Sequence, residues 1–463
     1  MRRPKGDNRW ALGTRGKVAS FMKQVISGVM IVLTAAVLAV PAAAQAQFSY
    51  ATNADGSIYT YSTNADGTIT IAAYSGPPWA VTIPTNIHGL VVTSIGNGAF
   101  EGLTNLTGIA IPGSVTNIGD LAFELCYRLT NASLANGVLS IGEHAFESCT
   151  SLTSVTIPST VTSIGEGSFT YCTGLTNVTI PGSVTNIGDS AFMFCYSLTN
   201  ATIVNGVTSI GDGAFAECIR LAGVTIPASV TNIGDSTFAG CTMLTNITLP
   251  GSITSIGNSV FEGCSGLTNV TIPGSVTNIG TNAFEGCYKL AGVTIPGSVT
   301  SIGESAFYMC EDLTSVTIPG NVSSIGDDAF TQCNSLISVY FTGNAPIADS
   351  SVFNGPLLGP VHGSTVYYLP GTTGWSNTFG GDPAVLWNPL IQTGDGSFGV
   401  RNNQFGFNIT GTPTIPIVVE ASTSLAGPVW TPRQSLTLTN GSYYFSEPFQ
   451  PGSSGRFYRI TSQ

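Results

Sequence analysis

The 463-residue sequence predicts an α/β solenoid, a stack of coils with parallel β-strands on the inner face and short helices outside, followed by a small all-β sandwich domain. Three observations lead to this prediction. A 23-residue unit occurs eleven times in succession. Within each unit, a stretch of alternating apolar residues is followed by one in which apolar residues are three positions apart. The 23-residue repeat is lost towards the C-terminus. Repeats of this length are typical of stacked coils, because one unit cannot bury its apolar side alone.

Residues 1–46 are predicted to be a signal peptide. They hold seven basic residues and one acid, and an uncharged, mostly apolar run from Val25 to Val40 precedes the small residues Ala44-Gln45-Ala46. A basic segment, an apolar segment and then small residues are the order that directs export. The preferred cleavage site is Ala44-Gln45-Ala46, and Ala42-Ala43-Ala44 is the alternative. An uncleaved membrane anchor is the alternative, because the charge-free stretch could just span a bilayer. We expect a secreted or cell-surface protein that is not inserted in a membrane after cleavage.

Residues 47–92 are predicted to form an N-terminal β cap. Two near-copies, Thr52-Asn-Ala-Asp55-Gly56 and Thr63-Asn-Ala-Asp66-Gly67, are each followed by a short alternating apolar run. Asp-Gly between such runs is typical of a hairpin turn. A cap is needed here because an open end of the stack would expose apolar surface and an unpaired strand edge.

Residues 93–343 hold the eleven units, marked by an Ile-Gly dipeptide that recurs from Ile95 to Ile325. The first half of each unit predicts a strand. In one unit, Leu175, Val178 and Ile180 fall on inward positions. Pro181 then ends the strand because it cannot donate to a ladder. A second inward-facing apolar segment follows, and Gly188 is expected to permit a turn.

The second half of each unit predicts a short helix. Ala191-Phe192-x-x-Cys195-x-x-Leu198 has three-residue spacing, and the position after Ile-Gly is mostly acidic. Such residues cap helices or favour their first turn. The acidic column is Asp120, Glu143, Glu166, Asp189, Asp212, Asp235, Glu304 and Asp327, with Asn97, Asn258 and Thr281 in the other units.

All ten cysteines keep the 23-residue step, from Cys126 to Cys333. An even number of cysteines in an exported chain usually indicates disulfides. Here every cysteine has the same role in its coil, and pairing neighbours would require alternating close and open gaps in a regular stack. The spacing therefore favours buried thiols that act as small apolar fillers.

The pattern Leu-x-x-Val-x-Ile-Pro…Val-x-x-Ile-Gly…Ala-Phe-x-x-Cys resembles the leucine-rich repeats of the BspA-like family, which occur in many secreted and surface bacterial proteins. The resemblance covers about residues 93–343. It implies a curved leucine-rich repeat superhelix whose parallel strands line the inner face. It also implies a role in adhesion, through binding of matrix proteins or other cells.

Two regions follow the repeats. Residues 344–390 are predicted to form degenerate C-terminal coils and a cap, because Val366-Tyr-Tyr-Leu369-Pro370 keeps the strand pattern without the regular step. The segment between the coils, with Gly355-Pro356 and Gly359-Pro360, is expected to be a loop. Residues 391–463 hold short alternating runs between Gly, Pro and Asn turns, which predicts a small β-sandwich module.

Composition limits the function. Only 8% of the residues are charged, and since the net charge is −11 overall but +6 over residues 1–46, the remaining chain carries −17. Such a surface repels nucleic acid and anionic lipid. The three histidines (His88, His144 and His362) lie in unrelated segments, and no nucleophile motif is present. We predict no catalytic, cofactor-binding or metal-binding residues, and a non-enzymatic protein.

The outward strand positions form the candidate binding face. One column is Thr156, Thr179, Thr202, Thr225, Thr248, Thr271, Thr294 and Thr317, and the other is Asn131, Asn177, Asn200, Asn246 and Asn269. Repeat proteins bind partners on such extended faces. We expect a monomer that binds an extracellular protein or polysaccharide. The alternatives are a structural protein that orders ice or water on the threonine ladder, and an accessory protein of a carbohydrate-active enzyme.

Overall fold

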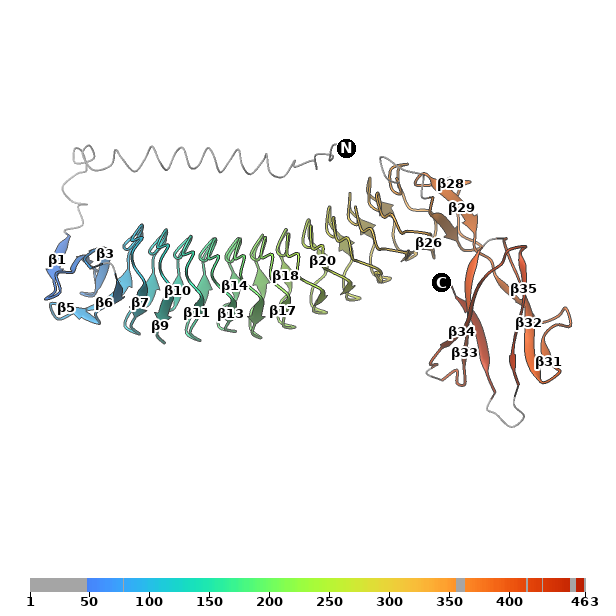
Figure 1. Ribbon diagram of the computed structural model, residues 1–463, viewed down its shortest axis with the longest axis horizontal. Coiled ribbons are helices and arrows are strands. Elements are labelled where there is room, and N and C mark those ends of the chain that lie inside the picture. Colours follow the sequence, from blue (N-terminus) through green and yellow to red (C-terminus); the bar gives the residue numbers. More distant parts are fainter. Residues whose placement is uncertain are drawn as a thin grey trace, which may run out of the picture. The chain divides into compact units, whose positions relative to one another are not determined.

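The computed structural model describes residues 48–77, 79–354, 363–413, 415–426, 428–449 and 455–461. The predicted signal peptide and most of the predicted loop between the last coils lie outside these residues. Figure 1 shows the repeats as stacked coils that follow one another in sequence order, each with strands on two sides. The protein is therefore a β-solenoid over its repeat region, as the 23-residue step predicts.

Nearly every coil contributes one strand to each of two parallel arrangements, and the coils of Thr294 and Ile347 contribute an isolated bridge to one of them. The first, called the long-strand sheet, contains β4 (Ala80–Thr82), β7 (Gly108–Ile111), β9 (Asn131–Leu134), β11 (Ser154–Thr156), β13 (Asn177–Ile180), β15 (Asn200–Ile203), β17 (Gly223–Thr225), β19 (Asn246–Thr248), β21 (Asn269–Thr271), β24 (Ser315–Ile318), β26 (Ser338–Phe341), β27 (Thr365–Tyr368) and β29 (Asp382–Leu386).

The second, called the short-strand sheet, contains β6 (Leu90–Ile95), β8 (Asn117–Ile118), β10 (Ser140–Ile141), β12 (Ser163–Ile164), β14 (Asn186–Ile187), β16 (Ser209–Ile210), β18 (Asn232–Ile233), β20 (Ser255–Ile256), β22 (Asn278–Ile279), β23 (Ser301–Ile302) and β25 (Ser324–Ile325). The N-terminal strands are β1 (Ser49–Thr52), β2 (Ile58–Thr63), β3 (Ile69–Ser75) and β5 (Asn86–Ile87). β2 and β3 form an antiparallel hairpin, and β3 pairs with β6 of the short-strand sheet.

The predicted helices are wrong: the described residues contain no helix, and the segment after each Ile-Gly is a series of turns. Two residues of each such segment have a positive φ, for example Ser190 (53°) and Phe194 (60°), which a right-handed helix does not allow. Their N–H groups donate instead to the next coil, to the carbonyls of Asp212 (2.7 Å) and Ala216 (2.9 Å). The N–H groups of Ala191 and Met193 bond three positions back, which explains the helix-like spacing, whereas Phe192 N–H also donates to the next coil.

The acidic column caps neighbouring coils rather than helices. Asp189 Oδ1 accepts from the backbone N–H of Asp212 at 2.9 Å, and Asp212 Oδ1 accepts from that of Asp235 at 2.8 Å. Asn97 and Asn258 accept equivalent bonds. Each of these side chains therefore satisfies a backbone donor one coil further on.

The glycine of Ile-Gly precedes the turn segment, and close packing of backbones requires it there, since Gly188 itself does not have a positive φ. A Cβ on Gly188 would lie 2.5 Å from the carbonyl carbon of Gly165 and 2.7 Å from the nitrogen of Glu166. Gly165, Gly280 and Gly303 meet the backbone of the preceding coil in the same way. The repeat therefore keeps glycine where successive coils touch through their main chains.

A stack of aromatic rings runs through the core. Thirteen rings, from Tyr74 through the phenylalanines to Phe353, stack with centroids 5.0–5.8 Å apart. One ring per coil gives a solenoid of thirteen turns. The two rings beyond the eleven predicted units, Tyr74 and Phe353, extend the same stack into the N-terminal strands and into a twelfth unit.

The cysteines lie beside this stack, and all ten are free and buried. Their burial is as predicted, but they are more than fillers. Every thiol lies within hydrogen-bonding distance of the phenylalanine carbonyl of the preceding coil, as in Cys195 Sγ to Phe169 O at 3.3 Å. Phe169 O also accepts from the N–H of Cys172 at 3.1 Å. The thiols thus add a weak bond between coils.

Both sheets are interrupted between the same two coils. β17 and β18 end one pair of sheets, and β19 and β20 begin the next. The turn segments remain joined there, because Phe238 N–H donates to Val260 O at 3.0 Å. The flanking ring pairs, Phe215–Phe238 and Phe238–Phe261, are the widest in the stack at 5.8 Å. The stack therefore loses its strand pairing at this joint while its turn side stays hydrogen-bonded.

The C-terminal strands form two sheets. One contains β30 (Leu390–Gln392), β31 (Gly399–Arg401), β32 (Gln404–Thr410) and β35 (Ser442–Pro448), and the other contains β33 (Pro416–Ser422), β34 (Thr431–Thr437) and β36 (Phe457–Thr461). β28 (Thr378–Phe379) pairs with β29. Phe407 and Phe445 of one sheet share a buried apolar cluster with Ile417 and Val419 of the other. The two sheets therefore pack face to face, as in a β-sandwich.

Candidate binding surfaces

The structure places the predicted threonine column on the outer side of the long-strand sheet. Thr202 is half-buried, and the other seven threonines are exposed. Thr179, Thr202 and Thr225 are register partners on β13, β15 and β17. Thr248, Thr271, Thr294 and Thr317 are likewise paired in series, although Thr294 forms only isolated bridges. The joint between β17 and β19 divides the column into two runs.

The predicted asparagines lie on the same outer side, four of them two positions before a threonine of the column and Asn131 two positions before Ser133. Asn177 pairs with Asn200, and Asn246 pairs with Asn269, and all four are exposed, as is Asn131. Together with the threonine column they form what we call the Thr/Asn face. The sequence placed these residues correctly because strand alternation depends only on local backbone geometry.

The threonines of the Thr/Asn face differ from those at the start of each strand. Thr130, Thr176 and Thr199 donate their hydroxyls to backbone carbonyls of the preceding coil at 2.9–3.3 Å. Among the described residues, no hydroxyl of the candidate column makes such a bond; Thr202 Oγ1 instead accepts from Asn200 Nδ2 on its own strand at 3.3 Å. The hydroxyls of the Thr/Asn face are therefore available for a partner.

The Thr/Asn face carries no charged residue, whereas the turn segments are acidic. In five of the coils the position after the stacked phenylalanine is a glutamate: Glu101, Glu124, Glu147, Glu262 and Glu285. Partial burial, together with the charges of Glu147 and Glu101, raises the pKa of Glu124 to about 7. Burial and the charge of Glu262 raise the pKa of Glu285 to about 7. The raised pKa values of Glu124 and Glu285 therefore lower the negative charge of these two turn segments near neutral pH.

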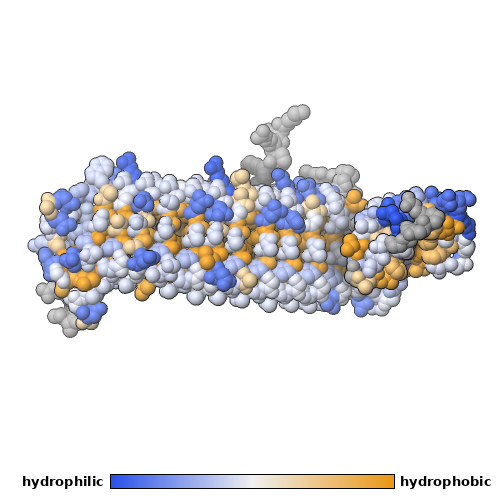
Figure 2. All heavy atoms as spheres, turned by 90° about the horizontal axis from the view of Figure 1, so that it is seen from below, coloured by the Kyte–Doolittle hydropathy of each residue, from blue (hydrophilic) through white to orange (hydrophobic). Residues whose placement is uncertain are grey.

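Figure 2 shows a long side of the molecule as largely pale, with lengthwise hydrophobic rows and only scattered, strongly hydrophilic groups. This matches a surface built from Thr, Ser and Gly with few charges. Local recognition on such a surface depends on hydrogen bonds and shape, while the net negative charge of residues 47–463 disfavours an anionic partner.

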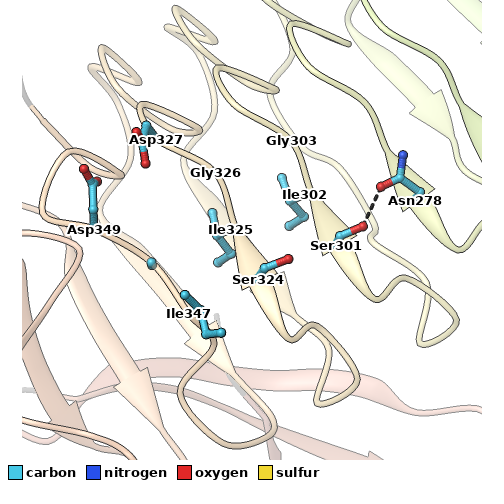
Figure 3. A pocket seen from close by; sticks show the side chains of 11 residues that line it. Asn278, Ser301, Ile302, Gly303, Ser324, Ile325, Gly326, Asp327, Ile347 and Asp349 are labelled. Carbon is cyan, nitrogen blue, oxygen red and sulfur yellow. Dashed lines mark hydrogen bonds between the residues drawn. The ribbon is translucent and has the colours of Figure 1, made fainter.

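A shallow pocket of about 450 Å³ opens on the short-strand sheet near its C-terminal end. Figure 3 shows Ser301 and Ser324 on adjacent coils, with Asp327 and Asp349 at the opposite side of the pocket. Ile347, which is 81% exposed, forms its rim. Its lining is mixed, because the isoleucines Ile302, Ile325 and Ile347 share it with the serine hydroxyls and the two carboxylates.

Sequence reasoning missed this pocket. The signal was present, because Ile347-Ala348-Asp349 repeats Ile325-Gly326-Asp327 at a step of 22 rather than 23. The backbone confirms this twelfth unit: Ile325 N–H donates to Ile347 O at 2.9 Å. A search restricted to the constant step ends one coil too early.

The two histidines that the structure describes, His88 and His144, do not converge on a shared site. His88 Nδ1 lies 3.0 Å from the hydroxyl of Tyr61, and His144 Nδ1 lies 2.7 Å from Glu147. The bond to Glu147 raises the pKa of His144. His362 lies outside the described residues. Within the described part of the chain, no group of three or more His, Cys, Asp or Glu side chains is arranged to hold a metal ion.

The sequence model of the BspA type leucine rich repeat region matches this chain in six copies, over residues 81–195, 116–245 and 231–357. These matches span more than half of the sequence, and the chain therefore belongs to the BspA-type leucine-rich repeat family. The resemblance seen in the repeat motif is confirmed. No curated protein matches the chain.

Solved structures of bacterial repeat proteins are similar to this chain. A leucine rich cell surface protein from Faecalibacterium prausnitzii A2-165 is 31% identical, over 66% of this chain and 92% of that one, with a TM-score of 0.46. A leucine-rich repeat protein from Bacteroides ovatus ATCC 8483 is 27% identical, over 74% and 98%, with a TM-score of 0.46. A leucine rich repeat protein of T. pallidum is 34% identical, over 40% and 87%, with a TM-score of 0.39.

The described residues include no helix long and apolar enough to cross a membrane.

Proposed function

We propose that this protein is an exported, cell-surface binding scaffold without catalytic activity, and that its Thr/Asn face binds an extracellular protein or polysaccharide. The observation that carries the proposal is the exposed, register-paired array of threonine and asparagine side chains on consecutive strands. The proposed export rests on the segment order of residues 1–46.

The chemistry of the array favours an uncharged, hydroxyl-rich or amide-rich partner. Threonine offers a hydroxyl and a methyl group, and asparagine offers a donor and an acceptor. Threonine is stiff at χ1, so holding it on binding costs little conformational entropy. A repeated spacing of about 4.8 Å between strands lets an extended chain contact several coils at once.

The interruption between β17 and β19 weighs against a water-ordering role. Ice binding requires one flat, continuous lattice of threonines, whereas the joint divides this column into two runs. A protein or glycan chain tolerates such a break, because each run can make its own contacts.

The test compares two triple variants of the mature full-length chain on glycan arrays and in adhesion assays to extracellular proteins and cells. Thr202→Ala, Thr225→Ala and Thr248→Ala together remove hydroxyls from the Thr/Asn face. Thr208→Ala, Thr231→Ala and Thr254→Ala make the same change on the short-strand side of the same coils. We expect the first variant to lose binding and the second to retain it. Equal binding by both, or no binding by the native protein to any ligand, would contradict the proposal.

A further inference from the structure

The charge of the chain changes sign at the C-terminal module. Residues 391–463 contain four arginines and three acids, a net charge of +1. Because residues 47–463 together carry −17, residues 47–390 carry −18. Over those 344 residues the only basic side chains are Arg128, Arg220 and Lys289. Residues 47–390 therefore repel an anionic group, whereas residues 391–463, with their net positive charge, do not.

Two of the four arginines are held by one buried carboxylate. Glu447 of β35 is only 7% exposed. It accepts from Arg433 Nε at 2.7 Å, from Tyr458 Oη at 2.6 Å and from Arg456 Nη1. Burial pushes the pKa of Glu447 up, but these hydrogen bonds outweigh it and keep the pKa below its usual value. Glu447 therefore stays charged and orients both guanidinium groups.

The backbone also directs Arg433. Val419 pairs with Gln434 and Glu420 pairs with Pro432, so Arg433 is the extra residue of a β-bulge in β34. Bulges redirect side chains and are frequent beside functional sites. The arginine side chains remain 37% (Arg433) and 36% (Arg456) exposed, although Glu447 engages one nitrogen of each.

Both guanidinium groups line a pocket of about 290 Å³. Its other walls include Ser422, Thr423, Val429 and Thr431. Thr431 donates its hydroxyl to Ala421 O at 3.1 Å, and Ser422 donates to Ser424 O at 2.9 Å. These bonds fix the hydroxyl oxygens at the wall, where they can accept from a ligand.

A role in stability alone does not explain why two arginines contact Glu447. One arginine would neutralise its carboxylate, but both Arg433 and Arg456 are paired with it. The neighbouring Glu420 does not neutralise the second, because it is paired with Arg459 at 2.6 Å. The group of three arginines and two glutamates retains one positive charge beside the pocket.

We propose that this pocket binds an oxyanion carried by a small hydroxylated molecule, such as the acid group of a sugar. A guanidinium fork matches the paired oxygens of a carboxylate, phosphate or sulfate, and two forks can hold one such group. The hydroxyl-lined wall and the size of the pocket suit a ligand no larger than a monosaccharide. This site is separate from the Thr/Asn face and does not depend on its function.

The test is titration calorimetry on the mature full-length protein at low salt, with D-glucuronate, inorganic phosphate and inorganic sulfate as probes and glucose as the neutral control. We expect at least one oxyanion to bind, weakening as salt is added, and glucose not to bind. Binding of glucuronate alone would assign the site to a carboxylate sugar. Binding of phosphate or sulfate would assign it to a phosphorylated or sulfated one.

Variants separate the site from the overall charge. Arg433→Gln or Arg456→Gln should weaken binding at least tenfold. Arg401→Gln removes the same charge from β31 outside the pocket and should leave binding unchanged. If the glutamine variants unfold the module, Arg433→Lys keeps a cation for Glu447 while losing the fork, and should fold yet bind less tightly. The triple alanine variant of the Thr/Asn face should bind the oxyanion normally.

Two results would overturn the inference. One is the absence of oxyanion binding to the native protein at millimolar concentration. The other is an equal loss of affinity in Arg401→Gln and Arg433→Gln, which would indicate nonspecific attraction to the charge of the module.

Discussion

Replacing Gly188 by alanine tests whether the coils touch through their backbones. The new Cβ would lie 2.5 Å from the carbonyl carbon of Gly165, so the two coils would have to separate by close to 1 Å to reach ordinary contact. That shift would also stretch the bond from Gly188 N–H to Ile164 O, now 3.1 Å, beyond hydrogen-bonding range. Overpacking costs about 1–3 kcal/mol and a lost hydrogen bond about 0.5–1.5 kcal/mol, so we expect a loss of about 2–4 kcal/mol.

The matched control is Gly251→Ala, because nothing lies within 4 Å of a Cβ at that position and its φ is not positive. Both changes reduce the entropy of the unfolded chain by a similar amount, which stabilises by about 0.4–1 kcal/mol. Gly251→Ala should therefore be neutral or slightly stabilising. The measurement is urea unfolding followed by circular dichroism. Equal stability of the two variants would refute the close-packing explanation of the Ile-Gly dipeptide.

Four further predictions follow from the same structure. Leu175→Asp should destabilise strongly because it places a charge in the core, whereas Thr179→Ala should leave the melting temperature nearly unchanged; similar losses would reverse the inward and outward assignment. Ellman titration should find about ten thiols after denaturation without reductant but few in the native protein, because burial raises their pKa values, as for Cys264 to about 12; few thiols after denaturation would indicate disulfides. The native state of Glu124 binds its proton more tightly than the unfolded chain, so stability should fall as the pH rises from about 4.5 to 7, and Glu124→Gln should reduce that fall in thermal melts from pH 5 to 8; identical pH profiles would argue against its burial. Deleting residues 175–197 in register should give a folded protein, whereas deleting 12 residues should unfold the stack, as judged by cooperative melting; unfolding by both deletions would show that the coils are not interchangeable.

The sequence by itself determined the solenoid, its step and the two sides of its strands. These features follow from local rules: Leu175, Val178 and Ile180 alternate with polar residues, Pro181 ends the ladder, and the same pattern returns 23 residues later. It also identified the Thr/Asn face, because alternation along a strand fixes which side chains point outward.

Only the tertiary structure decided what the turn segments are. The spacing around Phe192 and Cys195 resembles a helix, but residues such as Ser190 and Phe194 adopt positive φ because their N–H groups bond to the next coil. Sequence spacing reports local bonds and contains no information about donors satisfied 22 residues away. The same limit explains the glycine of Ile-Gly, the capping of one coil by the aspartate of another, and the pocket around Arg433 and Arg456. Each of these features depends on backbones or side chains that come together only when coils or sheets pack.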